Sequence, residues 1–223
     1  MRFALSGSQR FEASPDGKGY CPVCRGDVLS KCGTKRVWHW AHRVRTKCDH
    51  WWESETAWHR NWKMKFPADW QEVIVKGESG ELHIADVRTP LGLSVEFQHS
   101  SIPEEEQKER EEFYGDMIWV LDGTSGNQGY GNFMENIQFW QQREPTTGQI
   151  GARFNPMLVK ITKRWLTARR PVLIDFGGNT LWSISVKRES WAKYALEIKK
   201  DDFVPSVIQN ADPAAILSPW QLS

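Results

Sequence analysis

The fold is decided by two short stretches, Ala85-Asp86-Val87 and Leu93-Ser94-Val95-Glu96-Phe97-Gln98. Each has the short, partly alternating apolar pattern that is typical of a β-strand. Because residues i and i+2 of a strand point to the same face, Glu96 and Gln98 should project together. The two stretches predict a β-hairpin that presents the Asp86 and Glu96 carboxylates and the Gln98 amide at one point. The alternative is a half-exposed hairpin that carries ordinary surface acids.

Two carboxylates that converge on one spot favour a hard divalent cation. Mg²⁺ binds through one or two carboxylates and keeps coordination places for water and for a phosphate. We therefore predict that Asp86 and Glu96 hold Mg²⁺, or Mn²⁺ in its place.

The composition excludes several classes of protein. The chain has 223 residues, which is enough for one large domain or for a small domain beside a core. Its start, Met1-Arg2-Phe3-Ala4, is not followed by an apolar stretch long enough for a signal peptide or a membrane span, so we expect a cytoplasmic protein. Four cysteines in such a chain favour metal binding over disulfides.

The charges are distributed unevenly along the chain. Residues 1–65 carry 13 Lys and Arg against 6 Asp and Glu, which gives a net charge of +7. Residues 66–150 carry 5 against 16, or −11, and residues 151–223 carry 11 against 6, or +5. An acidic middle between two basic ends suits a metal-dependent site whose flanks attract a polyanion, and a mixed solvated surface is the alternative.

The first 50 residues have the spacing of a zinc-binding module. In Cys21-Pro22-Val23-Cys24, the two-residue gap lets both thiolates of one tight turn reach a single ion. After a hairpin-like stretch, His39-Trp40-Ala41-His42 begins beyond a gap of 14 residues, which is close to the gap between the two ligand pairs of a zinc ribbon. Protein would fill every ligand position, so the predicted zinc is structural. The ligands are four of Cys21, Cys24, His39, His42 and Cys48.

A helix is predicted at Trp51–Lys63, because tryptophans recur there at helical spacing. Its apolar face would consist of Trp51, Trp58 and Trp62. A stripe at i, i+4 and i+8 along the edge of that face consists of Glu55, His59 and Lys63. A carboxylate in this position would reach a site on the sheet against which the helix packs, and a plain surface ladder of charges is the alternative.

The following elements complete a core. Pro67 should end the helix, and Val73-Ile74-Val75 should form a strand before a turn at Gly77–Gly80. Serine caps, Pro103 in the first turn and three glutamates after it predict the start of a second helix. The run Asp116–Leu121 should be a short buried strand. The order helix, strand, strand, strand, helix, strand predicts an α/β core with a mixed sheet.

Several short motifs occur in one order along residues 20–122: CPVC, HWAH, a glutamate four residues before a histidine with a lysine beyond, ADV, EFQHS, and R-x-x-x-Y before IWVL. This arrangement resembles the competence protein CoiA-like family, a branch of the PD-(D/E)XK nuclease superfamily with an N-terminal zinc-binding region. The resemblance implies an α+β protein with a restriction-endonuclease-like core and a mixed sheet. A small zinc-ribbon-like module would precede that core and an α+β extension would follow it. The expected domains are residues 1–50, 51–125 and 126–223.

The resemblance also implies roles for individual residues. In that family, a helix glutamate, a strand aspartate and an E-x-K or E-x-Q pair bind Mg²⁺ and cut a phosphodiester bond. The matching catalytic residues are Glu55, Asp86, Glu96 and Gln98. Gln98 stands where the superfamily usually has lysine, and since an amide is no strong base, it would orient the attacking water by a hydrogen bond. Glu55 would hold a metal-bound water or a second metal. Supporting or backbone contacts are expected from His59, Arg110 and Tyr114.

The last hundred residues carry fewer motifs. We expect helices at Met134–Gln141 and Pro156–Ala168, a loop at Pro145–Gly151, and a β-hairpin at Pro171–Ile184 around a Gly-Gly-Asn turn. The inward face of the second of these helices would consist of Leu158, Ile161 and Trp165. A basic cluster would contact phosphates, unless it is only a solvated helix face. It consists of Lys160, Lys163, Arg164, Arg169 and Arg170.

The sequence as a whole predicts a Mg²⁺-dependent nuclease that hydrolyses phosphodiester bonds of DNA in DNA processing, recombination, competence or defence. RNA is the alternative polynucleotide, and no membrane partner is expected. The first alternative function is a non-catalytic, nucleic-acid-binding recombination factor that keeps the nuclease fold. The second is a structural zinc protein that acts only through partners. The chain has no Walker loop, no Rossmann glycines, no Ser-His-Asp order and no internal repeat.

Overall fold

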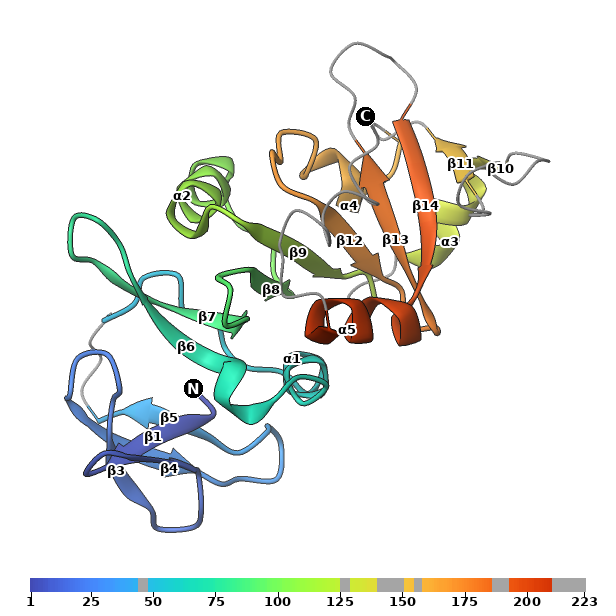
Figure 1. Ribbon diagram of the computed structural model, residues 1–223. Coiled ribbons are helices and arrows are strands. Elements are labelled where there is room, and N and C mark those ends of the chain that lie inside the picture. The colour runs from blue at the N-terminus through green and yellow to red at the C-terminus, as the bar shows by residue number, and fades with distance from the viewer. Residues whose placement is uncertain (44–47, 125–128, 140–150, 155–157, 186–192, 210–223) are drawn as a thin grey trace. The chain divides into compact units, whose positions relative to one another are not determined.

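The computed structural model describes residues 1–43, 48–124, 129–139, 151–154, 158–185 and 193–209 (Figure 1). The chain divides into two compact units, Met1–Arg88 and Thr89–Ser223. Both units combine helices with β-strands, so the α+β class predicted from the sequence is confirmed. The predicted functional boundaries after residues 50 and 125 do not coincide with this division and stay predictions. Within the described ranges, no helix is long and apolar enough to cross a membrane.

The first unit begins with a five-stranded antiparallel sheet in the order β2-β1-β3-β4-β5. Its strands are β1 (Phe3–Ser6), β2 (Gln9–Glu12), β3 (Lys18–Tyr20), β4 (Asp27–Lys31) and β5 (His39–His42). A small core beside the sheet includes Cys21, Val28 and Trp40. The Trp40 ring meets Phe11 edge-on at 5.0 Å between centroids, and its indole N–H donates to the Phe11 carbonyl at 3.2 Å. The pair β4–β5 is the hairpin expected between the two predicted ligand pairs.

Helix α1 (Ala57–Lys63) begins later than predicted, so Trp51 and Glu55 lie outside it. Thr56 forms a capping box with His59: the Thr56 hydroxyl accepts from the His59 N–H, and the His59 ring accepts from the Thr56 N–H. Such reciprocal bonds fix the start of a helix. The helix ends at Lys63, and Pro67 caps the 3-10 turn η1 (Ala68–Trp70), so the prediction that Pro67 ends the helix is wrong.

The predicted hairpin around Gly77–Gly80 is confirmed. It joins β6 (Gln71–Lys76) to β7 (Leu82–Arg88) in antiparallel register, with Ile74 opposite Ile84. Burial alternates along β7, because the odd-numbered residues from position 83 to 87 are buried and their neighbours are only half-buried. Asp86 therefore lies on the half-buried face of β7 together with Ile84.

The second unit is built on a mixed sheet in which the described strands follow the order β10-β11-β14-β13-β12-β9-β8. Strands β8, β9 and β12 run parallel, and the other neighbours are antiparallel. Their bounds are β8 (Ser94–Gln98), β9 (Met117–Asp122), β10 (Ile137–Phe139), β11 (Gly151–Phe154), β12 (Val172–Asp175), β13 (Thr180–Ser185) and β14 (Lys193–Lys199). The buried strand predicted after the second helix is β9, and the predicted C-terminal hairpin is β12–β13.

Helix α2 (Glu104–Tyr114) connects β8 to β9, as parallel strands require. It starts where predicted, but its N-cap residue is Pro103 and no side chain caps it, so the expected serine caps are wrong. Buried Glu111 fixes the helix by two hydrogen bonds. One Glu111 oxygen accepts from the Trp119 indole N–H and the other from the Arg169 backbone N–H, each at 3.0 Å.

Two helices predicted in the C-terminal part are wrong. The chain forms α3 (Tyr130–Glu135) and then β10, because Asn136 ends the helix and donates a side-chain hydrogen bond to the Asn132 carbonyl at 2.8 Å. Within the predicted helix 156–168, only α4 (Lys160–Lys163) is helical among the described residues. Its inward residues are Val159, Thr162 and Trp165, whereas Leu158 is 58% exposed.

The end of the described chain differs from the prediction. The predicted loop at 145–151 lies outside the described residues except for Gly151, which begins β11. Helix α5 (Lys200–Gln209) was not predicted and follows β14 directly.

Candidate metal centre

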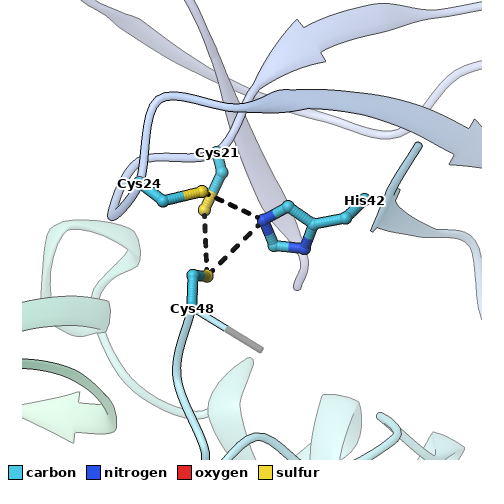
Figure 2. Close-up of side chains that lie close together, drawn as sticks. All are labelled: Cys21, Cys24, His42 and Cys48. Carbon is cyan, nitrogen blue, oxygen red and sulfur yellow. Dashed lines mark hydrogen bonds between the residues drawn. The ribbon is translucent and has the colours of Figure 1, made fainter. Parts of the chain in front are cut away.

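Four side chains of the first unit meet at one point (Figure 2). The Cys21 and Cys48 sulfurs are 3.7 Å apart, and the His42 Nε2 lies 3.3 Å from the Cys24 sulfur and 3.5 Å from the Cys48 sulfur. Zinc bonds of about 2.3 Å to sulfur and about 2.0 Å to nitrogen place tetrahedral ligands about 3.8 Å apart for S–S and about 3.5 Å apart for S–N. The spacings match those of a tetrahedral Cys₃His site, so these residues are close enough to bind a metal such as zinc.

The first two ligands lie in a tight turn between β3 and β4. The Cys21 N–H donates to the Gly26 carbonyl at 2.8 Å, and the Arg25 N–H donates to the Cys21 carbonyl at 2.9 Å. Arg25 adopts a left-handed φ of 60°, and the Gly26 N–H then donates to the Cys24 sulfur at 3.4 Å. The turn thus points both sulfurs to one side and supplies a backbone donor for the negative charge of a thiolate.

The strand register decides which histidine joins them. In β5, side chains alternate between faces, so His39 and His42 point in opposite directions. His42 lies opposite Val28 of β4 and shares its face with the buried Trp40. The His39 ring instead bonds the Val37 carbonyl through Nδ1 at 2.8 Å. Of the five candidate ligands, the structure therefore brings together all except His39.

The fourth ligand, Cys48, comes from the segment that leads to α1. Cys48 was one of the five candidate ligands named from the sequence. The remaining cysteine, Cys32, packs against the small core of the sheet.

Burial shifts the ionisation of three of these side chains, Cys21, His42 and Cys48. Burial raises the pKa of the Cys48 thiol well above its usual range, and the Cys21 sulfur adds to this shift. Burial also raises the pKa of Cys21 and lowers the pKa of His42. A divalent cation stabilises the thiolates and accepts the neutral imidazole, so metal binding must release thiol protons and must weaken as the pH falls.

A second polar cluster in the first unit surrounds the ammonium group of Lys63, the last residue of α1. The Lys63 Nζ lies 2.8 Å from Glu72, 2.9 Å from Glu55 and 3.6 Å from Asp86. Arg60 lies 2.6 Å from the other oxygen of Glu55. The side chains of Glu55 and Glu72 are 4% and 7% exposed, whereas that of Asp86 is 23% exposed. Two of the predicted catalytic residues, Glu55 and Asp86, thus share one buried cation.

The cluster is charged in the folded state. Burial alone would lower the pKa of Lys63, but the three carboxylates outweigh it and raise that pKa. Burial would raise the pKa of Glu72, and the charge of Lys63 outweighs it, so the pKa of Glu72 falls to about 2. Despite its burial, Glu55 has a lowered pKa because it accepts a hydrogen bond from Arg60.

Glu72 is the member of this cluster that sequence reasoning missed. Its carboxylate accepts the backbone N–H groups of Arg2 and Phe3 at 2.8 and 3.1 Å. These partners lie about 70 positions away in the sequence, so no local pattern points to them. The left-handed φ of Glu72, 48°, is uncommon for a residue with a side chain and is held by these bonds.

The other two predicted catalytic residues lie in the second unit, on the fully buried strand β8. Arg110 Nη1 lies 3.5 Å from the Glu96 carboxylate, and the same guanidinium also bonds Glu106 of α2. Burial lowers the pKa of Arg110, but Glu96 and Glu106 outweigh it and raise that pKa. The Gln98 amide donates to the Ser100 carbonyl at 2.9 Å. The hairpin that would unite Asp86 with these residues joins the two units and stays a prediction.

The residues predicted to support the site are placed as follows. His59 Nε2 lies 3.4 Å from the Glu53 carboxylate. Burial lowers the pKa of His59, but its hydrogen bond to Glu53 and the charge of Asp86 outweigh burial and raise that pKa. Tyr114 is buried one turn after Arg110 on α2.

The basic cluster divides into two groups. Lys160, Lys163 and Arg164 are exposed on and just after α4. Arg169 and Arg170 instead lie 3.3 Å from Glu112 and 3.8 Å from Asp116. The first group is therefore the better candidate for contacts with phosphates.

Residues 11–50 match the family model described as competence protein CoiA, N-terminal domain. This match supports the assignment of the chain to the CoiA-like family. The matched segment contains all four members of the Cys₃His cluster, so the metal centre belongs to the part of the chain that identifies the family. Comparisons of this CoiA-like chain with curated proteins and with solved structures found no match.

Proposed function

We propose that this CoiA-like protein is a Mg²⁺-dependent nuclease with a PD-(D/E)XK core that acts on DNA. The observation that supports the proposal most is the charge cluster around Lys63. Glu55 and Glu72 are sealed against Lys63, whereas the Asp86 carboxylate is 23% exposed and lies farther from the ammonium group. Of the three carboxylates, Asp86 is therefore the one most open to a cation from solvent.

Asp86 and Glu96 are the proposed metal ligands, because carboxylate oxygens are the donors that Mg²⁺ prefers. The bound ion would polarise a phosphate and lower the pKa of the attacking water. The Gln98 amide donates to the Ser100 carbonyl, which fixes the orientation in which its own oxygen would accept a hydrogen bond from that water. Arg110 would hold the Glu96 carboxylate in place through their 3.5 Å contact.

The role proposed for Glu55 differs from the role predicted from the sequence, in which it held a metal-bound water or a second metal. Both of its oxygens are engaged by cations, one by Lys63 and one by Arg60. Its proposed role is therefore to hold Lys63 beside Asp86. The E-x-Q pair of this protein lacks the lysine that is usual in the superfamily. Lys63, at the end of α1, would supply a positive charge beside the proposed ligand Asp86 instead.

The remaining parts of the chain would serve substrate binding and folding. The Cys₃His centre would hold a structural Zn²⁺, because protein ligands fill all four tetrahedral positions. The exposed basic residues on and after α4 would contact phosphates without regard to sequence. These residues are Lys160, Lys163 and Arg164.

A non-catalytic, DNA-binding recombination factor is the second candidate. It is favoured by one observation: Glu96 already has a cationic partner in Arg110, in a strand that is buried throughout. A buried carboxylate that is fully neutralised by arginine needs no metal ion.

One assay separates the two candidates. The purified protein is incubated with plasmid, linear, branched and single-stranded DNA in Mg²⁺, Mn²⁺ or EDTA. The nuclease proposal predicts cleavage of at least one substrate in Mg²⁺ or Mn²⁺ and none in EDTA. Glu96→Gln should abolish that cleavage, whereas Glu109→Gln, an exposed glutamate of α2, serves as the matched control and should not. Binding without cleavage under every condition would favour the second candidate.

A further inference from the structure

Asp49 follows the metal ligand Cys48 and forms hydrogen bonds with β7, the strand that carries Asp86. One oxygen of the Asp49 carboxylate lies 2.9 Å from His83 Nδ1, and the other accepts the backbone N–H of Ile84 at 3.0 Å. Asp49 also accepts the backbone N–H of Trp51 at 3.0 Å. The side chains of Asp49 and His83 are 7% and 5% exposed, so these bonds are shielded from water.

Aromatic packing reinforces the same junction. The Trp51 indole stacks on the His83 ring with 3.4 Å between centroids and 18° between planes. The turn that begins at Cys48 is thus joined to β7 by a carboxylate on one side and by a stacked ring on the other.

The contacts of β7 continue from this junction toward Asp86. Ile84, whose N–H Asp49 binds, packs its side chain against the small core that contains the ligand Cys21. Asp86 is the next residue on that face of the strand, since side chains two positions apart share a face. Asp49 therefore contacts β7 two residues before Asp86.

We infer that Asp49 is a positioning residue that couples occupancy of the Cys₃His centre to the placement of Asp86. Metal binding fixes Cys48, Cys48 fixes the adjacent Asp49, and Asp49 holds β7 at Ile84. Loss of the metal frees this anchor without touching Asp86 itself. The consequence for catalysis rests on the proposed nuclease function, whereas the coupling of the metal centre to β7 does not.

The hydrogen bonds at this junction argue against a second metal site made of the same residues. Asp49, His50 and His83 offer ligand atoms within 4.8 Å of one another. However, both Asp49 oxygens are already acceptors of hydrogen bonds from the His83 ring and the Ile84 N–H. We call the bonds that join Asp49 to His83 and Ile84 the clamp. A metal ion at Asp49 would have to break these bonds.

Hydrogen exchange of the β7 amides tests the clamp. In Asp49→Asn, the side chain keeps one acceptor oxygen and gains an N–H₂ group, so it can no longer accept from both partners. Exchange across residues 82–88 should accelerate by about 10- to 100-fold, the loss expected for a hydrogen bond to a charged group. Zinc content should remain at one per chain. Chelation of zinc from the wild-type protein should accelerate the same amides.

Two further variants test whether the effect is specific to the contact between Asp49 and His83. His83→Phe keeps a ring for Trp51 to stack on but removes the Nδ1 partner, so it should reproduce part of the acceleration. Asp16→Asn, an exposed aspartate of the same module, is the matched control and should leave β7 exchange unchanged. In a cleavage assay at constant zinc content, Asp49→Asn should also raise the Mg²⁺ concentration for half-maximal rate, a change that loss of stability alone would not cause.

Unchanged exchange of β7 in both Asp49→Asn and zinc-free wild type would overturn the inference. A zinc content of two per chain that falls to one in Asp49→Asn would overturn it in favour of a second metal site. If the wild-type protein cleaves no DNA, the proposed function fails, and the exchange data still decide whether the clamp exists.

Discussion

Replacement of Lys63 by methionine gives the sharpest energetic test of the buried charge cluster. Methionine has a similar length and no charge, so it removes the ammonium group that lies within 3.6 Å of three carboxylates. Glu55 keeps Arg60 as a partner, and Asp86 is 23% exposed and can be hydrated. Glu72 is only 7% exposed and loses its one side-chain cation among the contacts described above. The cost therefore falls mainly on Glu72.

The size of that cost follows from the pKa of Glu72. Lys63 holds this pKa at about 2, well below the ordinary value of a glutamate. The difference of two to three units corresponds to about 3 kcal/mol, and the removal of one partner from a buried ion pair typically costs about 3–5 kcal/mol. The raised pKa of Lys63 reports the same interaction and is not added to this figure. We expect Lys63→Met to lower the free energy of unfolding by about 3 kcal/mol at pH 7.

The sign of the pH dependence follows as well. A carboxylate with a lowered pKa in the folded state stabilises the protein above its unfolded pKa of about 4, and this stabilisation is lost as the pH falls toward 2. The difference between wild type and Lys63→Met should therefore be largest at pH 7 and should shrink below about pH 4. Urea unfolding at pH 7 and at pH 3.5 measures this difference, with Lys76→Met, which replaces an exposed lysine of β6, as the control. Equal stability of Lys63→Met and Lys76→Met at pH 7 would refute the reasoning.

Three further predictions concern the metal centre and the substrate. His42→Ala should lose zinc on dialysis against a mild chelator, whereas His39→Ala should retain about one zinc per chain, since a structural site has four ligands; equal retention by both variants would contradict the ligand set. Acidification should release zinc as the thiols regain protons, which a metal-sensitive dye can follow, and release that does not depend on pH would argue against thiolate ligands. Replacement of Lys160, Lys163 and Arg164 by glutamine should weaken DNA binding about equally for all sequences and reduce the salt slope by up to about 3, and an unchanged slope would assign these residues to a solvated surface.

Local sequence signals predicted the elements whose causes are local. The hairpin β12–β13 follows from its Gly-Gly-Asn turn, and the start of α2 follows from Pro103 and the glutamates after it. The Cys21–Cys24 turn was likewise recognised from its spacing. Such elements carry their own stop and start signals within a few residues, so one sequence is sufficient to find them.

Periodicity alone misplaced the helix boundaries. The tryptophan periodicity suggested a helix from Trp51, but Asp49 binds the Trp51 N–H and the Thr56 capping box starts the helix later. Within the predicted helix at 156–168, the helical part among the described residues is only Lys160–Lys163, and Glu111, far away in the sequence, binds the Arg169 N–H beyond it. Periodicity shows which residues face a core, whereas specific hydrogen bonds such as the Thr56 capping box decide where a helix begins.

The candidate site shows the same limit. The five possible zinc ligands were found from residue type and spacing, but only the register of β5 distinguishes His42 from His39. Glu72 was missed because its partners at Arg2 and Phe3 lie at the other end of the unit's sequence. A sequence therefore shows which residues could bind a metal, whereas the pairing of buried charges is known only once the fold is known.

The central claim is that Asp86 holds the cation on which DNA cleavage depends. Its most direct test is the rate of Mg²⁺-dependent cleavage by Asp86→Asn, compared with wild type and with Asp69→Asn, an exposed aspartate of the same unit, at equal zinc content. A metal ligand contributes several kcal/mol to the transition state, so we expect the Asp86→Asn rate to fall by at least about 100-fold. Asp69→Asn should cleave at the wild-type rate. Cleavage by Asp86→Asn at the wild-type rate would contradict the proposed site.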